Sequence, residues 1–189
     1  MEDYEKEETA LDKLNEKNHY NKILLNICYR LRKKLYLRKS NFVMQNIMSP
    51  LQNKSKDLVS AAKLLHANNL YPAVAHSAYY CCVQLMKHIW LHSFNKTEQD
   101  LKQELKAFNK QMRLTGGQEA GTHEFLINQI GLHIQNFQNI SDLRRFNSNI
   151  WQLKKLRVDA DYSDTDFDVV KSNSSLTLSK MIVPILQKY

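Results

Sequence analysis

Hydrophobic side chains recur every three or four residues through most of the chain after Pro50, which is the spacing of an α-helix. No segment alternates between polar and apolar residues in the way that a β-strand does. The predicted helices cover residues 51–68, 72–94, 97–113, 122–137, 140–161 and a last segment that ends near 187. The pattern predicts an all-α fold, an antiparallel bundle of four to five helices with an additional N-terminal helix.

One of these helices differs from the rest because it is apolar nearly all round. In the segment 72–94, Val74 and Ala78 share one face, while Tyr80, Cys81 and Trp90 lie outside it. A helix without a polar face is stable only when other helices surround it. We therefore expect this helix at the centre of the bundle.

Capping residues mark several helix ends. Thr97, followed by acidic residues, predicts the start of the third helix, since its hydroxyl can accept from a backbone N–H of the first turn. The segment from Ser163 to Asp166 is predicted to cap the last helix, and Pro184 to distort its final turns.

Composition narrows the class of protein. The 189 residues include only 4 glycines and 3 prolines, which argues against an all-β sandwich and against a Gly-rich nucleotide-binding loop. The 3 cysteines are an odd number and two are adjacent, so a disulfide framework is not expected. No apolar stretch is long enough to span a membrane, and the acidic N-terminus does not resemble a secretory signal. We expect a cytoplasmic protein that does not associate with a membrane.

The net charge of +8 is unevenly distributed. Residues 1–16 sum to −5, and residues 17–39 contain eight basic residues and no acid. Three interpretations of this basic segment stay open: an arm for nucleic acid, a helix with solvated charges, or a stretch outside the natural protein, with translation starting at Met44 or Met48. We divide the chain into an N-terminal extension, 1–43, with one helix, and a helical bundle, 44–189.

Two segments resemble the HEPN domain family. The first runs from Ala61 to Tyr80, where a short break precedes an Ala-rich helix with a Tyr79–Tyr80 pair. The second runs from Leu153 to Tyr162 and reads Leu-x-x-x-Arg-x-x-Ala-Asp-Tyr. The resemblance covers about residues 51–188 and implies a helical bundle that forms homodimers. It also implies two kinds of function: metal-independent RNase toxins paired with a nucleotidyltransferase-like antitoxin, and inactive members that bind nucleotides or proteins.

The nuclease members of that family use an Arg followed four to six residues later by a His, which together stabilise phosphate charge and move protons. Here the matching Arg157 is followed at those positions by Asp161, Tyr162 and Ser163. The proton-transfer partner is missing from the motif. The resemblance therefore implies a non-catalytic or degenerate module that binds nucleotide, RNA or a partner protein and is linked to a toxin–antitoxin or defence system.

Two alternatives stay open beside this interpretation. One is an RNase toxin with a non-standard active site that uses Tyr162 or a distant His, so the enzyme question is undecided and no catalytic residue is assigned. The other is a dimerisation or adaptor domain without a ligand. The candidate residues for binding nucleotide or RNA are Arg157, Asp161, Tyr162, Lys154, Arg144 and Arg145.

Other chemistry-bearing residues lead to weaker hypotheses. His88 and His92 have the i, i+4 spacing of a zinc-binding pair, but no further ligand follows at a suitable distance, so we expect no metal and no cofactor. His123 and Glu124 open a helix, where capping and catalysis are both open interpretations. Arg157 and Asp161 are spaced to form an ion pair along one helix face.

Overall fold

The computed structural model describes residues 48–164 and 166–189. These residues contain six α-helices and one π-helical turn, and no strand occurs among them. The elements are α2 (Pro50–Ala67), α3 (Tyr71–His88), η1 (Ile89–Ser93), α4 (Glu98–Leu114), α5 (Thr122–Asn136), α6 (Ile140–Tyr162) and α7 (Val169–Leu186). The prediction of an all-α fold is confirmed, with six helices instead of four to five.

The predicted N-terminal helix and the boundary between residues 43 and 44 lie outside the described residues. None of the described helices combines the length and the apolar character needed to cross a bilayer.

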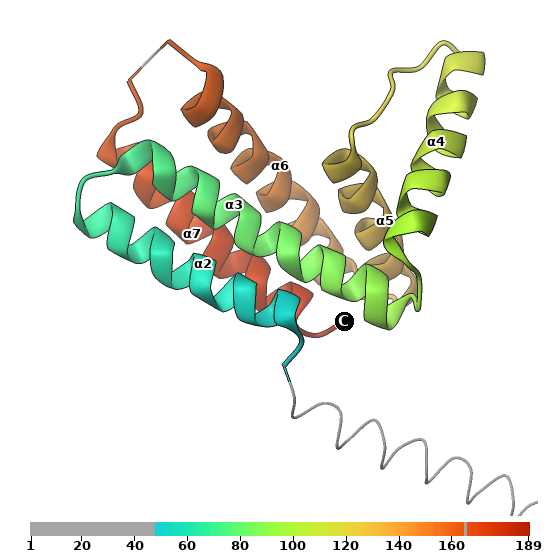
Figure 1. Ribbon diagram of the computed structural model, residues 1–189, viewed down its shortest axis with the longest axis horizontal. Coiled ribbons are helices and arrows are strands. Elements are labelled where there is room, and N and C mark those ends of the chain that lie inside the picture. Colours follow the sequence, from blue (N-terminus) through green and yellow to red (C-terminus); the bar gives the residue numbers. More distant parts are fainter. Residues whose placement is uncertain (1–47, 165) are drawn as a thin grey trace, which may run out of the picture. The chain divides into compact units, whose positions relative to one another are not determined.

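Helix α3 is the centre of the structure. Helices α2 and α7 run alongside it, and α6 crosses it at an angle (Figure 1). Ten of its residues are buried, from Val74 to Met86, which confirms the prediction from its continuous apolar surface. The central core is formed by α3 together with buried side chains of the surrounding helices, among them Ala62, Ile130, Phe146, Ile150, Leu153 and Ile182.

The chain leaves α3 through a π-helical turn, in which the amide of Phe94 donates to the carbonyl of Ile89 at 3.0 Å. One extra residue in the turn changes the direction of the side chains that follow. The side chain of Trp90 is buried here, and its indole N–H donates to the carbonyl of Thr97 at 2.9 Å. A second, smaller core forms around it, from Trp90, Leu101, Phe125 and Leu126.

When α3 and the π-helical turn η1 are taken together, the ends of the predicted helices agree with the structure to within one residue, except at the start of the last helix. Thr97 caps α4 as predicted and accepts from the amide of Asp100 at 3.1 Å. The predicted cap between Ser163 and Asp166 is wrong. Asp168 caps α7 instead, because its backbone is extended and its carboxylate accepts from the amide of Lys171 at 2.9 Å.

Candidate functional site

Arg157, in the last turns of α6, is the centre of a polar and aromatic cluster. Its side chain is only 17% exposed, and its Nε lies 2.8 Å from Oδ2 of Asp161, so the ion pair predicted along the helix is present. The guanidinium carbon lies 5.7 Å from the ring centre of Tyr80 and 5.5 Å from that of Tyr162. A guanidinium packed against aromatic rings and one carboxylate is held in a defined position.

The charge of Arg157 is maintained although much of the side chain is buried. Burial opposes the charged form, but the Asp161 carboxylate and the phenols of Tyr80 and Tyr162 outweigh it and raise the pKa of Arg157. The site therefore contains a permanent positive charge.

A histidine from α3 reaches the same carboxylate. Nδ1 of His76 lies 3.5 Å from Oδ2 of Asp161, the oxygen that also faces Arg157. The His76 ring stacks on Tyr80 with their centres 4.4 Å apart, and its side chain is 48% exposed. Asp161 thus links α3 to α6 and leaves Nε2 of His76 available to a ligand.

A second histidine approaches from α5. The ring centre of His123 lies 5.6 Å from that of Tyr79 and 5.5 Å from that of Tyr80. Burial lowers the pKa of His123, and the positive charges of Arg157, Lys87 and Lys154 lower it further. His123 is therefore neutral at neutral pH, with one ring nitrogen able to accept a proton.

Tyr79 has a buried hydroxyl without a hydrogen-bond partner among the described residues. Only 1% of the residue is exposed, and the ring lies beside His123 and Tyr80. Burial raises the pKa of Tyr79, while the positive charge of Arg157 acts in the opposite direction. An unpaired buried hydroxyl costs about 1–3 kcal/mol, so its presence beside a charged group needs an explanation.

The N-terminus of α5 forms one wall of the site. Gly121 precedes the first turn, and no side chain caps the amides there. Lys154 of α6 pairs with Glu124, and this hydrogen bond lowers the pKa of the Glu124 carboxyl. A hollow of about 390 Å³ opens here, lined by Gly121, Thr122, His123, Glu124 and Lys154.

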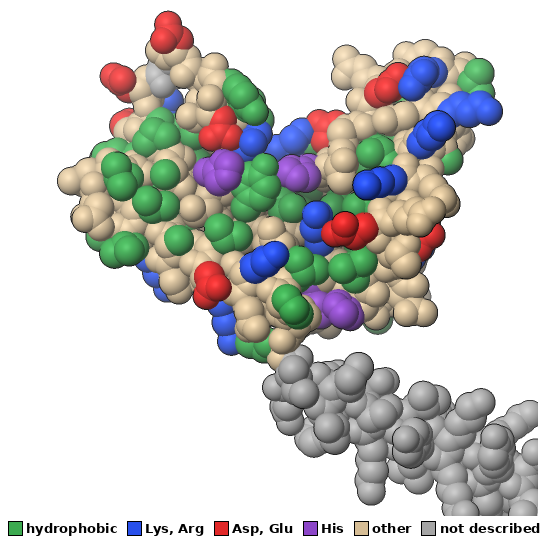
Figure 2. Space-filling model, in the orientation of Figure 1, with side chains coloured by type: hydrophobic (Ala, Val, Ile, Leu, Met, Phe, Trp, Pro, Cys, Tyr) green, Lys and Arg blue, Asp and Glu red, His purple; other side chains and the backbone are tan. Residues whose placement is uncertain are grey.

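These groups lie on a concave surface. Figure 2 shows two histidine side chains on either side of a hydrophobic patch, with basic and acidic side chains above them. They occupy the hollow between the C-terminal end of α6 and the α4–α5 pair. The hollow is open to solvent, so a ligand can reach it without a rearrangement of the helices.

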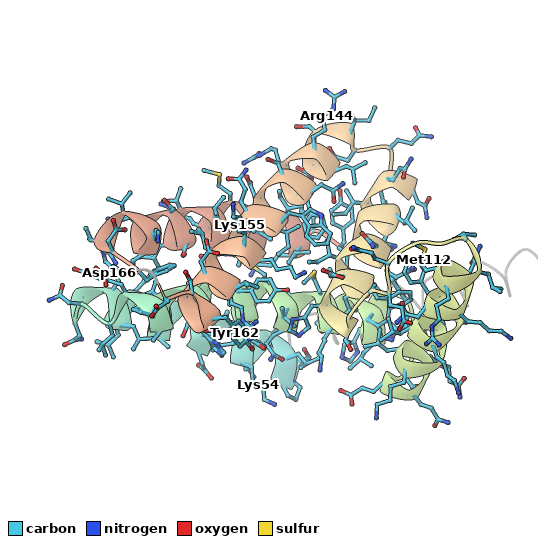
Figure 3. The ribbon with its side chains drawn as sticks, turned by 90° about the horizontal axis from the view of Figure 1, so that it is seen from above. Lys54, Met112, Arg144, Lys155, Tyr162 and Asp166 are labelled. Carbon is cyan, nitrogen blue, oxygen red and sulfur yellow. The ribbon has the colours of Figure 1, made fainter. Side chains whose placement is uncertain are left out.

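The six residues predicted from the sequence fall into two places. Arg157, Asp161, Tyr162 and Lys154 lie in or beside the cluster. Arg144 lies at the opposite end of α6 from Tyr162 (Figure 3). Its neighbour Arg145 is about 18 Å from Arg157 along the helix axis, from the rise per residue, and lines a separate hollow with Lys180 of α7 and with Lys188, which follows that helix.

Several residues of the site were not among the sequence candidates, among them His76, Tyr79 and His123. His76 and Tyr79 lie within the Ala-rich segment that resembles the HEPN family, and for His123 at a helix start the sequence leaves capping and catalysis open. No local spacing connects them with Arg157, because they lie 81, 78 and 34 residues before it. Only the packing of α3 and α5 against α6 brings them together.

The other histidine pair is isolated from this cluster. The rings of His88 and His92 have centres 4.6 Å apart, and Nδ1 of His88 lies 2.9 Å from the hydroxyl of Ser49. Within residues 48–164 and 166–189, no three His, Cys, Asp or Glu side chains converge in a way that could hold a metal ion.

No family model, curated protein or solved structure matches the chain. The site itself is therefore the basis for a functional assignment.

Proposed function

We propose that the cluster around Arg157 binds a phosphate group of a nucleotide or of RNA. The observation that supports this best is a permanently charged guanidinium packed beside two tyrosine rings, one of which also contacts two imidazoles. Arg binds phosphate through paired N–H groups, and aromatic rings can stack on nucleobases.

Two further features support an anionic ligand. No N-cap side chain occupies the amides at the start of α5, helix N-termini commonly bind anions, and Lys154 lines the same hollow together with the Glu124 carboxylate. The hydroxyl of Tyr79 is a donor without a partner among the described residues, and because it is buried, a ligand contacts it only by displacing the side chains around it. Both features lie next to His123, which connects them to the Arg157 cluster.

The wider setting belongs to the same proposal. The HEPN resemblance suggests a homodimer and a nucleotidyltransferase-like partner protein, and the module would then act in a toxin–antitoxin or defence system. In that setting the absence of the His from the motif after Arg157 suggests binding without cleavage.

Metal-independent RNA cleavage is a second candidate, favoured by one observation. His76 and His123 approach Tyr80 from two different helices, so two imidazoles lie near the Arg157 guanidinium. One imidazole would accept the proton of an RNA 2′-hydroxyl, whose oxygen forms a bond to phosphorus as the bond to the 5′-oxygen breaks. The other would donate a proton to that leaving oxygen, while Arg157 stabilises the charge on phosphorus.

Binding of 5′-AMP and of a short fluorescent oligoribonucleotide, measured by calorimetry and anisotropy, tests the proposal. Arg157→Ala should weaken binding by about tenfold or more, since bonds to charged groups are worth about 1.5–3 kcal/mol. Arg157→Lys should recover only part of the loss, because Lys lacks the paired N–H groups. Arg145→Ala, at the far end of the same helix, should leave the affinity unchanged.

The cleavage candidate needs a separate assay. The same RNA is incubated with the protein in the presence of EDTA and examined on a gel. Cleavage that disappears in both His76→Ala and His123→Ala would establish the nuclease. RNA that stays intact would exclude cleavage of this RNA and support binding without cleavage. If neither ligand binds but the protein is dimeric in solution, the proposal is wrong. The result would then favour a dimerisation or adaptor domain without a ligand.

A further inference from the structure

Asp161 is the internal anion of the site. A single oxygen, Oδ2, lies 2.8 Å from Nε of Arg157 and 3.5 Å from Nδ1 of His76. The other carboxylate of the cluster, Glu124, is paired with Lys154. Each of the basic side chains that would meet a phosphate therefore already faces a carboxylate.

A phosphate group that binds Arg157 must compete with this carboxylate. Because Asp161 is attached to the same helix one turn away, it acts at a high effective concentration. An internal RNA phosphodiester carries one negative charge, the same as the carboxylate, and so has no electrostatic advantage over it. A terminal phosphate monoester carries a charge of about −1.5 to −2 at neutral pH and has three acceptor oxygens.

The donors of the site match the larger number of acceptors. Arg157 can offer its remaining guanidinium N–H groups, and the hydroxyl of Tyr79 has no partner among the described residues. The amides of the first turn of α5, which no N-cap side chain occupies, complete the set. A monoester can accept from donors on three sides, whereas a diester uses two of its four oxygens as bridges to the chain.

We propose that this site binds a terminal phosphate monoester, on a nucleotide or at an RNA end. Asp161 sets this specificity because its carboxylate stays paired with Arg157 until a dianionic phosphate displaces it. The inference rests on the proposed phosphate binding and goes beyond it by naming the ligand class and the residue that selects it.

The experiment compares short oligoribonucleotides of one sequence that differ only at their ends. One has a 5′-phosphate, one a 3′-phosphate, and one has hydroxyls at both ends, so the internal phosphodiesters are identical. Affinities are measured for the wild-type chain, for Asp161→Asn and for Asp159→Asn. Asp159 lines a separate hollow between α6 and α7, so its substitution controls for the loss of one negative charge on α6.

The wild-type chain should bind at least one phosphate-ended RNA about tenfold more tightly than the hydroxyl-ended RNA, the gain expected from charge-assisted hydrogen bonds. The two phosphate-ended RNAs show which terminus is preferred. Asp161→Asn should bind the hydroxyl-ended RNA more tightly than the wild type does and so reduce the preference to about threefold or less. Asp159→Asn should keep the wild-type preference.

Equal affinity of the wild-type chain for all three RNAs would overturn this inference, and so would an unchanged preference in Asp161→Asn. In either case, RNA binding that depends on Arg157 would still support the proposed function. Binding that is absent, or that Arg157→Ala leaves unchanged, would overturn both. The circular dichroism of Asp161→Asn reports its folding, and if this variant does not fold, Asp161→Ser is measured in its place with the same expected loss of preference.

Discussion

The two hydrophobic cores of the molecule differ in how completely their helices are enclosed. In the central core, α3 has ten buried residues and is packed by α2, α6 and α7. In the side core, α4 has one buried residue, Leu101, and its other faces are in solvent. A helix enclosed by several neighbours resists local opening, whereas a helix held along one face opens more easily.

The candidate site lies where these two regions meet. Helix α3 supplies His76 and Tyr79, and α6 supplies Arg157, all attached to the central core. His123 comes from α5, whose Ile130 packs in the central core and whose Phe125 packs in the side core. Three of these residues are therefore carried by helices of the central core, and His123 by a helix that contributes to both cores. The comparison therefore predicts that damage to the two cores has different consequences.

The largest difference is expected from truncating one side chain in each core. Phe146 of α6 is completely buried in the central core, and Phe146→Ala should lower the free energy of unfolding by about 3–5 kcal/mol. Leu105 of α4 is only partly buried in the side core, and Leu105→Ala should cost about 1 kcal/mol. Urea denaturation of the two variants measures both values.

Hydrogen exchange distinguishes global from local effects in the same pair. Leu105→Ala should increase exchange in α4 while α7 stays protected, and Phe146→Ala should increase exchange in all helices. Equal losses of stability, or exchange that rises everywhere in Leu105→Ala, would contradict the distinction between the cores.

A decrease in pH should lower the stability of the fold by less than the truncation of Phe146 does. Burial lowers the pKa of His123 and of His133 in α5, and also that of His88, where the neighbouring His92 adds to the effect. Each group therefore binds a proton more readily in the unfolded chain, whose histidines titrate near pH 6.5. Stability is complete above that value and decreases as the pH falls through it.

The Tm should decrease by a few degrees between about pH 7.5 and pH 5.5. Two of the three histidines lie on α5, so exchange should increase in α4 and α5 before it increases in α7. Acidic groups with a lowered pKa, such as Glu124, lose their charge below this range and do not account for the effect. A Tm that stays constant over these two pH units would show that protonation of these histidines is not linked to unfolding.

The smallest effect on stability, and the most informative one for the site, is expected from Tyr79→Phe. The substitution removes a buried hydroxyl that has no partner among the described residues and keeps the ring that packs in the central core. The free energy of unfolding should stay the same or increase by up to about 1 kcal/mol, because a desolvation cost disappears. Phosphate binding should weaken, since one donor of the site is lost.

Tyr80→Phe is the matched control for Tyr79→Phe. The Tyr80 hydroxyl is 3.4 Å from Nη2 of Arg157, a long contact, and the ring itself supports Arg157 and His76. A marked loss of stability in Tyr79→Phe would mean that its hydroxyl is satisfied in the folded protein and is not available to a ligand.

Local information in the sequence was enough to predict most helix boundaries. The hydrophobic spacing is a property of neighbouring turns, and Thr97 caps α4 through an amide three residues away. The start of α7 was predicted incorrectly because Asp164, Asp166 and Asp168 are all suitable cap residues, and only the backbone conformation shows which of them accepts the bond. The π-helical turn that follows α3 was not predicted either, because hydrophobic residues in such a turn have nearly the same spacing along the sequence as in an α-helix.

The sequence by itself determined an all-α chain, a central apolar helix and an Arg157–Asp161 pair, because these depend on residues a few positions apart. The tertiary structure decided that His76 and His123 accompany that pair and that Arg144 and Arg145 do not. The physical reason is that a helix fixes which residues share its own face, while the residues it meets depend on how separate helices pack.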